Sequence, residues 1–397
     1  MTRRLLLHAV TSLLAAACTA GDSAPRASIV RDSAGVRIAE NPSGVSGEEW
    51  RLQTPAALEI GRREGQGPGP DLFGAIRQAI LLSTGDIVVA DGLAAEIRVF
   101  DEDGGHLLTI GGRGEGPGEF INLWTIAEWA GDSIAAVDAA GERASVFTSA
   151  GTFARSFAIP RLPEASAPNA VGWLEGGTLL IHTRTRSPSR DTRDQSTHLL
   201  YAADRHGEVL NTLGEFPGDR LGGNGLGLAF GGRAVFAAGG TLAWYGHSSR
   251  FELTGYDATG SLRRVVRLDR APRPVTDTDM SRAKAAVEEG LRGMTGPAVE
   301  RMLATEFAST HPVHGELLSG AAGYLWVERY RDQFAEDPGP QVWDIFDADG
   351  RLTGRLEAPA GFRITDVGAG SVVGVSADSL GVETVRVYRL QRGPGER

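Results

Sequence analysis

A set of polar residues in this chain could do chemistry together, because each member falls in a predicted loop between two apolar runs. If they share one site, the carboxylates could bind Ca²⁺, the histidine could act as a general base, and the arginines could hold an anionic group. For each residue taken singly, a salt bridge between structural units is the competing interpretation. The members are Asp91, Asp138, Arg143, Arg184, His247, Arg250, Arg331 and Asp378.

These residues are far apart in sequence, so a shared site requires a fold that gathers distant loops on one face. A segment that occurs twice indicates such a fold. The run Gly65–Gly69 (GQGPG) returns as Gly114–Gly118 (GEGPG), and the register then holds, with Asp138 placed 47 residues after Asp91. A fixed period of about 40–50 residues, filled with short β-type runs, is typical of a propeller blade.

The first repeat shows the four strands that such a blade needs. Short apolar or alternating runs cover 75–82, 86–90, 97–100 and 106–110, and turn residues separate them. The turn between the third and fourth strands ends at a glycine, and the same pattern of strand and turn recurs along the chain. The glycines that end these turns are Gly104, Gly151, Gly207, Gly260 and Gly350.

The last blade shows only three strands, over 362–367, 371–375 and 384–390. The N-terminal run 50–60 is the expected fourth, outer strand, and it would close the ring without leaving a free sheet edge. The sequence therefore predicts an all-β fold, a six-bladed β-propeller of four-stranded antiparallel blades closed by an N-terminal strand.

On these motifs the chain resembles the six-bladed β-propeller lipoproteins related to NHL-repeat proteins. The residues that carry the resemblance are Ile110–Phe120 and the strand and turn Ile97–Gly104. The resemblance implies the fold and an envelope compartment. It implies no site, since most members have no established activity.

The N-terminus predicts export. Arg3 and Arg4 precede an apolar run that is too short to span a bilayer, and small residues precede Cys18. We expect lipidation of Cys18, with an ordinary signal peptide and a chance cysteine as the alternative. The protein is then extracytoplasmic and held at the bacterial envelope by its lipid alone. The expected divisions are a signal peptide over 1–17, a tether over 18–33, the propeller over 34–391 and a tail over 392–397.

A helical pattern interrupts the propeller between 272 and 314. Met280, Val287 and Leu291 follow helical spacing, and Pro297 opens a second short helix. The segment is predicted to be a helical hairpin inserted between the fourth and fifth blades. In a propeller, such a connection emerges on the same face as the loops between second and third strands. The hairpin therefore either covers the channel mouth as a lid or packs against the rim of the propeller without a functional role.

Composition excludes several functions. The chain carries 50 acidic and 40 basic residues, a net charge of −10, which argues against nucleic acid as a partner. No resident metal or other cofactor is predicted, because His311 and His314 have metal-like spacing but supply too few ligands. The one cysteine, Cys18, leaves no thiol nucleophile in the domain, and no nucleophile-elbow motif is present.

The leading prediction is a non-catalytic ligand-binding or scaffold lipoprotein that recognises a peptide, glycan or envelope protein at the channel mouth. The alternative is a metal-assisted hydrolase or lyase at the same mouth, with Ca²⁺ held by Asp91, Asp138 and Asp378 and with His247 as base. Four arginines within 183–197, Arg184 among them, could bind an anionic group or could form a solvated loop.

Overall fold

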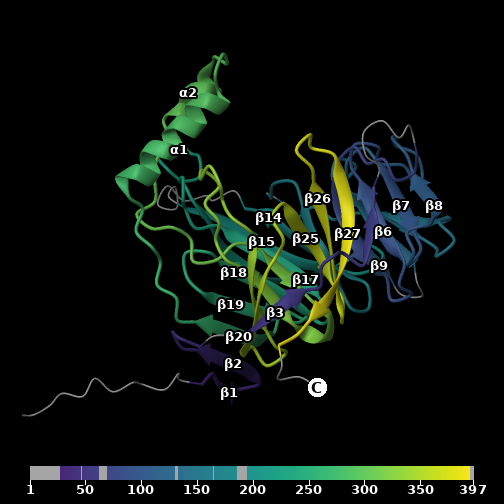
Figure 1. Ribbon diagram of the computed structural model, residues 1–397, viewed down its shortest axis with the longest axis horizontal. Coiled ribbons are helices and arrows are strands. Elements are labelled where there is room, and N and C mark those ends of the chain that lie inside the picture. The colour runs from purple at the N-terminus through teal and green to yellow at the C-terminus, as the bar shows by residue number, and fades with distance from the viewer. Residues whose placement is uncertain are drawn as a thin grey trace, which may run out of the picture.

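The strands of the computed structural model form six blades around a central channel, as the sequence predicts (Figure 1). The structure describes residues 27–45, 47–61, 69–129, 133–163, 165–185 and 195–393. The expected signal peptide, the lipidation site Cys18 and the arginines at 186, 190 and 193 lie outside the described residues.

The first three blades are regular four-stranded antiparallel sheets that run outward from the channel in chain order. Blade one has β5 (Ile76–Leu81), β6 (Ile87–Asp91), β7 (Glu96–Phe100) and β8 (His106–Gly111). Blade two has β9 (Leu123–Trp129), β10 (Ser133–Asp138), β11 (Arg143–Phe147) and β12 (Phe153–Ala158). Blade three has β13 (Asn169–Leu174), β14 (Thr178–Arg184), β15 (Gln195–Ala203) and β16 (Val209–Arg220).

The other three blades carry additional strands from the N-terminus on their outer edges. Blade four has β17 (Ala234–Gly239), β18 (Leu242–His247), β19 (Glu252–Tyr256) and β20 (Leu262–Leu268). Blade five has β21 (Leu317–Ser319), β22 (Leu325–Glu328), β23 (Val342–Phe346) and β24 (Leu352–Glu357). Blade six has β25 (Phe362–Val367), β26 (Ser371–Ala377) and β27 (Glu383–Gln391).

The core lies between neighbouring blades. Every residue of β6 is buried, because a second strand has sheet neighbours on both edges and other blades against both faces. Phenylalanines that recur at the 47-residue spacing pack there: Phe73 meets Phe100 with ring centroids 6.1 Å apart, and Phe120 meets Phe147 at 6.0 Å. The innermost strands β5, β9, β13, β17, β21 and β25 line a channel cavity of about 310 Å³.

The N-terminal segment forms a belt over three successive blades. β2 (Val36–Asn41) runs parallel to β20, and β3 (Glu48–Leu52) runs parallel to β24. β3 also meets the end of β27, and β4 (Leu58–Ile60) pairs antiparallel with β27, so the predicted closure of blade six is confirmed. The run expected as one strand over 50–60 is split in two, with Pro55 between the parts.

The last residues of the tether expected over 18–33 form a strand. β1 (Ile29–Ser33) pairs with β2 as a hairpin, and its turn residues Ala34 and Gly35 have φ values of 50° and 80°. Positive φ at both central residues is the geometry that favours a tight β-hairpin. The β-branched Ile29 and Val30 then extend the sheet of blade four to six strands.

The predicted helical hairpin is present between β20 and β21. α1 (Asp277–Gly290) begins at Thr276, which forms a capping box with Asp279, and α2 (Pro297–Leu303) begins at a proline. Figure 1 shows the hairpin projecting from the disc on the side where the β26–β27 loop also rises. In the part of the chain that the structure describes, no helix is long and apolar enough to cross a membrane.

Candidate functional site

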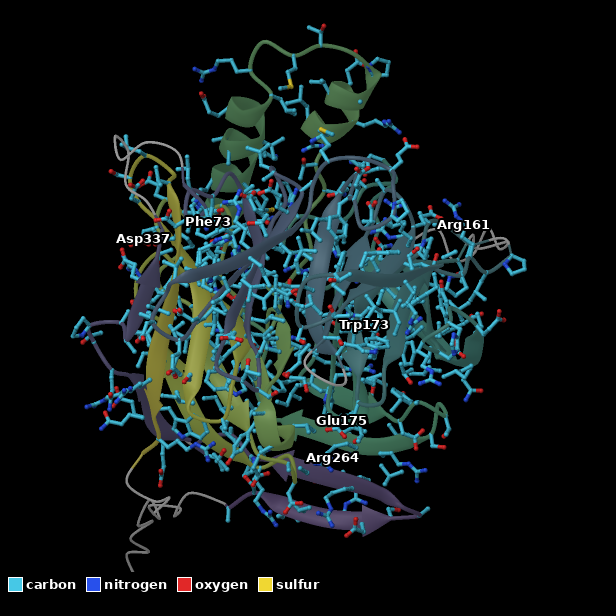
Figure 2. The ribbon with its side chains drawn as sticks, turned by 90° about the vertical axis from the view of Figure 1, so that its right-hand side faces the viewer. Phe73, Arg161, Trp173, Glu175, Arg264 and Asp337 are labelled. Carbon is cyan, nitrogen blue, oxygen red and sulfur yellow. The ribbon has the colours of Figure 1, made fainter. Side chains whose placement is uncertain are left out.

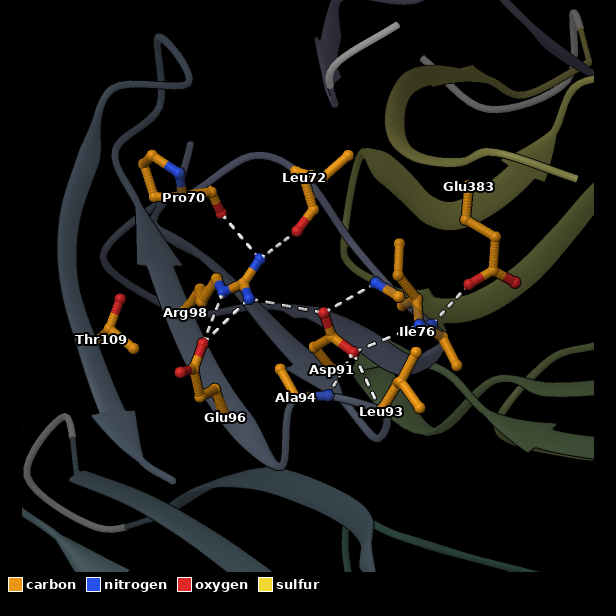
Figure 3. A network of polar contacts seen from close by, with 12 residues as sticks. Pro70, Leu72, Ile76, Asp91, Leu93, Ala94, Glu96, Arg98, Thr109 and Glu383 are labelled. Atoms are coloured by element: carbon orange, nitrogen blue, oxygen red, sulfur yellow. Dashed lines mark hydrogen bonds and ion pairs between the residues drawn. The ribbon is translucent and has the colours of Figure 1, made fainter. Parts of the chain in front are cut away.

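Asp91 is a structural residue. Its carboxylate is fully buried and accepts hydrogen bonds from the amides of Gly74, Ala75, Leu93 and Ala94, at 2.9 to 3.2 Å (Figure 3). Arg98 lies 3.5 Å away as its ion partner. The carboxylate thus joins the entry of its blade to the loop between β6 and β7.

Asp138 has the same role in blade two. It is fully buried and accepts hydrogen bonds from the amides of Ile121, Asn122 and Gly141. Arg143 lies 3.7 Å from it and donates to the carbonyls of the glycine-rich loop, Glu115 O and Glu119 O, at 2.7 Å each. Asp91 and Asp138 each act within their own blade, and the structure does not bring them together as a pair.

Three of the other predicted residues form exposed local contacts. Asp378 accepts the amides of Leu380 and Val382 and so organises the β26–β27 turn. Arg250 faces Glu252 at 3.4 Å, and its side chain is 65% exposed. Arg184, at the end of β14, faces Asp219 at 3.3 Å.

A polar cavity does lie on the expected face, between blades three, four and five at the foot of the helical hairpin. It has a volume of about 480 Å³ and we call it the polar pocket. Figure 2 shows Asp337, in the loop after β22, on the same side of the disc as the hairpin, with Glu175 toward the opposite side. The charged and titratable residues that line the polar pocket are Asp219, Arg220, Arg233, His314, Glu328, Tyr330 and Arg331.

Arg331 is the one predicted residue that lines this pocket. Its Nε donates to Glu328 Oε1 at 2.9 Å, and Gln341 Nε2 donates to the same oxygen at 3.1 Å. The Glu328 carboxylate is buried, whereas the Arg331 side chain is 34% exposed. The pair therefore anchors the guanidinium through Nε, and Nη1 donates to the Gly339 carbonyl at 3.5 Å.

The three arginines of the pocket differ in how they are paired. Arg233 faces Glu316 at 2.6 Å on the rim. Arg220 is exposed at the end of β16, and within the described residues its guanidinium makes no hydrogen bond or ion pair. Its neighbour Asp219 is already paired with Arg184. Arg220 is thus a positive charge at the pocket with no ion partner among the described residues.

His314 supplies a neutral imidazole to the same pocket. Its ring is 1% exposed, and Nδ1 lies 2.9 Å from the Gly315 carbonyl, which assigns the proton to Nδ1. Burial lowers the pKa of His314 to about 4. The Arg250 backbone also lies close enough to the ring to act as a hydrogen-bond partner, and this contact raises the pKa against the effect of burial. A neutral imidazole is therefore buried at the pocket wall.

Other histidines gather behind this wall. His247 Nε2 donates to the Gly218 carbonyl at 2.9 Å, and its Nδ1 lies 2.7 Å from Ser249 Oγ. His182 and His198 place their Nδ1 atoms 3.0 Å apart, and burial lowers the pKa of His182 to about 4. His247 therefore holds the strand end that carries Asp219 and Arg220. The sequence gives no local signal for this grouping, because the histidines come from three different strands.

A second, apolar cavity adjoins the polar pocket. It has a volume of about 360 Å³ and lies between α1, α2 and the loop that joins β16 to β17, and we call it the apolar pocket. Gly227 lines both pockets. The other residues of the apolar pocket are Asn224, Leu226, Val287, Gly290, Leu291, Met302 and Thr305.

The base of the hairpin is fixed by a buried network. Asp279 accepts from the Thr276 amide at 2.9 Å and contacts His311 at 3.2 Å, and these contacts hold its pKa well below the usual range. Arg282 joins Asp279 to Asp332 in the loop after β22. Among the residues that the structure describes, no group of three or more His, Cys, Asp or Glu side chains could hold a metal ion.

Comparisons with known proteins agree on the architecture. The family model of DUF5128, described as a 6-bladed beta-propeller, matches residues 72–215. No curated protein matches the chain. Two solved structures from Bacteroides are similar over nearly their full length and share the fold.

One of them is a member of the DUF4221 family from Bacteroides vulgatus ATCC 8482. It has a TM-score of 0.52 and 13% identity, and the match covers 88% of this chain and 100% of that one. The other is a protein described as exported, from Bacteroides fragilis NCTC 9343. It has a TM-score of 0.50 and 12% identity, with 89% and 99% covered.

Proposed function

We propose that this protein is a non-catalytic binding protein of the bacterial envelope, and that it holds its ligand in the polar pocket. One observation carries the proposal. The pocket combines the guanidinium of Arg220, which has no partner among the described residues, with the anchored guanidinium of Arg331. A concave site with a few convergent polar groups is the usual form of a ligand site, and guanidinium groups favour an anionic ligand group.

The location of the pocket supports a recognition role. A propeller presents loops from several blades on one face, and here blades three, four and five all contribute to one cavity. The helical hairpin stands beside this cavity and does not need to close the channel to take part in binding. In the alternative, a metal-assisted hydrolase or lyase, the proposed Ca²⁺ ligands were Asp91, Asp138 and Asp378. Each of these carboxylates accepts hydrogen bonds from backbone amides.

Envelope location and lipid anchoring at Cys18 are part of the proposal. They are supported by the basic and apolar N-terminal sequence and by the similarity to a protein described as exported. Labelling cells with a radioactive fatty acid tests the anchor. We expect the label and membrane fractionation to be lost in Cys18→Ala, and an unlabelled wild-type protein would refute anchoring.

A thermal-shift screen with small carboxylates, organic phosphates, neutral sugars and dipeptides tests the binding role. We expect at least one anionic compound to raise the melting temperature of the wild-type protein but not that of Arg331→Ala. Arg250→Ala is the matched control, because Arg250 is an exposed loop arginine outside the pocket. The proposal fails if no compound protects the protein, or if both variants respond as the wild type does.

A further inference from the structure

We infer that the polar and apolar pockets form one bipartite site for an anionic amphiphile, a molecule with a carboxylate head and a single apolar chain. This inference rests on the proposed function and names the class of ligand. The head would lie at Arg220, and the chain would pass Gly227 into the apolar pocket between α1 and α2. The two cavities, of about 480 and 360 Å³, are each within the usual size of ligand sites.

The first step of the argument is the contact between the pockets. Gly227 lines both, and a side-chain atom added at Gly227 would meet nothing within 4 Å. The space around Gly227, which we call the passage between the pockets, is therefore open, and it lies at the surface because Gly227 is exposed. Leu228 donates its amide to the Arg220 carbonyl at 3.0 Å, which places Arg220 directly beside the passage on its polar side.

The second step is the contrast in chemistry across Gly227. On one side lie Arg220 and Arg331, and on the other lie Val287, Leu291 and Met302. Met302 is 43% exposed, although the removal of apolar side chains from water is favourable. A charged head with an apolar chain satisfies both halves of the site at once, whereas a wholly polar or wholly apolar ligand would satisfy only one.

The third step separates an acyl chain from a peptide. A bound peptide needs backbone partners, and most amides of the loop between the two pockets already donate within the protein. The Ala229 amide, for example, donates to Glu306 O at 2.8 Å, and the Leu226 amide donates to Asn224 Oδ1 at 2.9 Å. The loop amides that donate in this way are those of Gly222, Gly223, Gly225, Leu226, Leu228, Ala229 and Gly231. A chain without hydrogen-bonding groups suits such a wall.

The experiment is calorimetric titration of the protein, produced as Cys18→Ala so that no detergent is needed. The probes are dodecanoate below its micelle concentration, butyrate, and dodecyltrimethylammonium. Dodecanoate is the full amphiphile. Butyrate has the carboxylate head with almost no chain, and dodecyltrimethylammonium has the long chain with a positively charged head. We expect dodecanoate to bind at least about tenfold more tightly than either other probe, because only it matches both pockets.

Two variants test the path of the ligand. Arg220→Gln should weaken dodecanoate binding about tenfold or more through loss of the charged contact. Gly227→Leu should abolish it by filling the passage. Gly370→Leu is the matched control, because Gly370 also has open space around it, has no positive φ and lies in the β25–β26 turn. It should bind dodecanoate as the wild type does.

The outcomes distinguish this inference from the proposed function. If dodecanoate binds no more tightly than butyrate, or if Gly227→Leu binds it normally, the bipartite site is refuted. The binding role still stands in that case if the thermal-shift screen gives an Arg331-dependent ligand. If neither experiment gives a ligand that depends on the pocket arginines, both proposals fall.

Discussion

Asp344 accepts hydrogen bonds of 2.7 and 3.0 Å from Arg329, and this pair is the reverse of the pair in blade one. Strand pairing places Asp344 on β23 where blade one has Arg98 on β7, and places Arg329 where blade one has Asp91. The positive and negative partners have therefore changed strands. The position requires opposite charges but does not fix which strand carries which sign.

The reversed pair predicts a stability effect for Asp344. This carboxylate is 1% exposed and also accepts from Arg270 at 2.6 Å, so Asp344→Ala leaves two arginines without their partner. Because both arginines are partly exposed, water screens part of the loss. We expect a cost of about 2–3 kcal/mol in the free energy of unfolding, measured with urea. Asp349→Ala, which removes exposed pairs, should cost less than about 1 kcal/mol. Equal costs would contradict this interpretation.

The N-terminal belt predicts that Asn41 stabilises the junction of blades four and five. Asn41 is 2% exposed, donates from Nδ2 to Arg267 O and Gly350 O, and accepts the Leu352 amide at 2.9 Å. Asn41→Ala leaves these buried groups unsatisfied. We expect a loss of about 2–4 kcal/mol in urea unfolding.

Asn211→Ala is the control for the belt, because the Asn211 side chain makes one long contact of 3.4 Å, to Ala258 O. It should change the free energy of unfolding by less than about 0.5 kcal/mol. A small effect of Asn41→Ala would show that the belt adds little to stability.

Much of the fold could be predicted because it repeats. The 47-residue spacing from Asp91 to Asp138 shows that the sequence of one blade occurs twice, and a repeated blade predicts a ring of such blades. The helical pattern around Met280 and Pro297 stood out against this period and located the hairpin. The β1–β2 hairpin was missed because its turn is Ala34-Gly35, which lacks the usual Asn or Asp before glycine.

The site was predicted less well, because loop position does not show where a side chain points. Asp91 precedes Gly92 at the end of a buried strand, and aspartate in that setting often accepts amides of its own turn, a signal that favours a structural role. Arg220 and His314 were not among the predicted residues. Arg220 ends a fourth strand and His314 follows the hairpin, so neither lies in a loop between second and third strands. Only tertiary structure brings them to Arg331.

The amide contacts of Asp91 predict that its effect on stability does not depend on metal. Asp91→Ala removes the acceptor of four backbone amides and the partner of Arg98, and we expect a loss of about 3–5 kcal/mol. The melting temperature is measured with Ca²⁺ and with EDTA for both proteins. The same difference between wild type and variant should appear in each buffer. A Ca²⁺-induced rise in the wild type that Asp91→Ala lacks would show instead that Asp91 binds the ion.

Buried histidines predict how stability depends on pH. Burial lowers the pKa of both His182 and His314 to about 4, against 6.5 when exposed to water. The unfolded chain therefore binds more protons than the folded protein between pH 6.5 and 4. Stability should be constant, as far as these groups are concerned, above pH 6.5. As the pH is lowered from 6.5 to 4, the free energy of unfolding should decrease by up to about 1.4 kcal/mol per pH unit for each histidine.

Urea unfolding from pH 7.5 to 4.5 tests this dependence on His314. In His314→Gln the slope of the free energy of unfolding should decrease, because one group that resists protonation has been removed, even if the variant is less stable at pH 7.5. His106→Gln is the control for replacing a histidine by glutamine, since His106 is exposed on β8. If His314→Gln keeps the wild-type slope, the imidazole must take up a proton in the folded protein. The neutral imidazole assigned to the wall of the polar pocket would then be wrong.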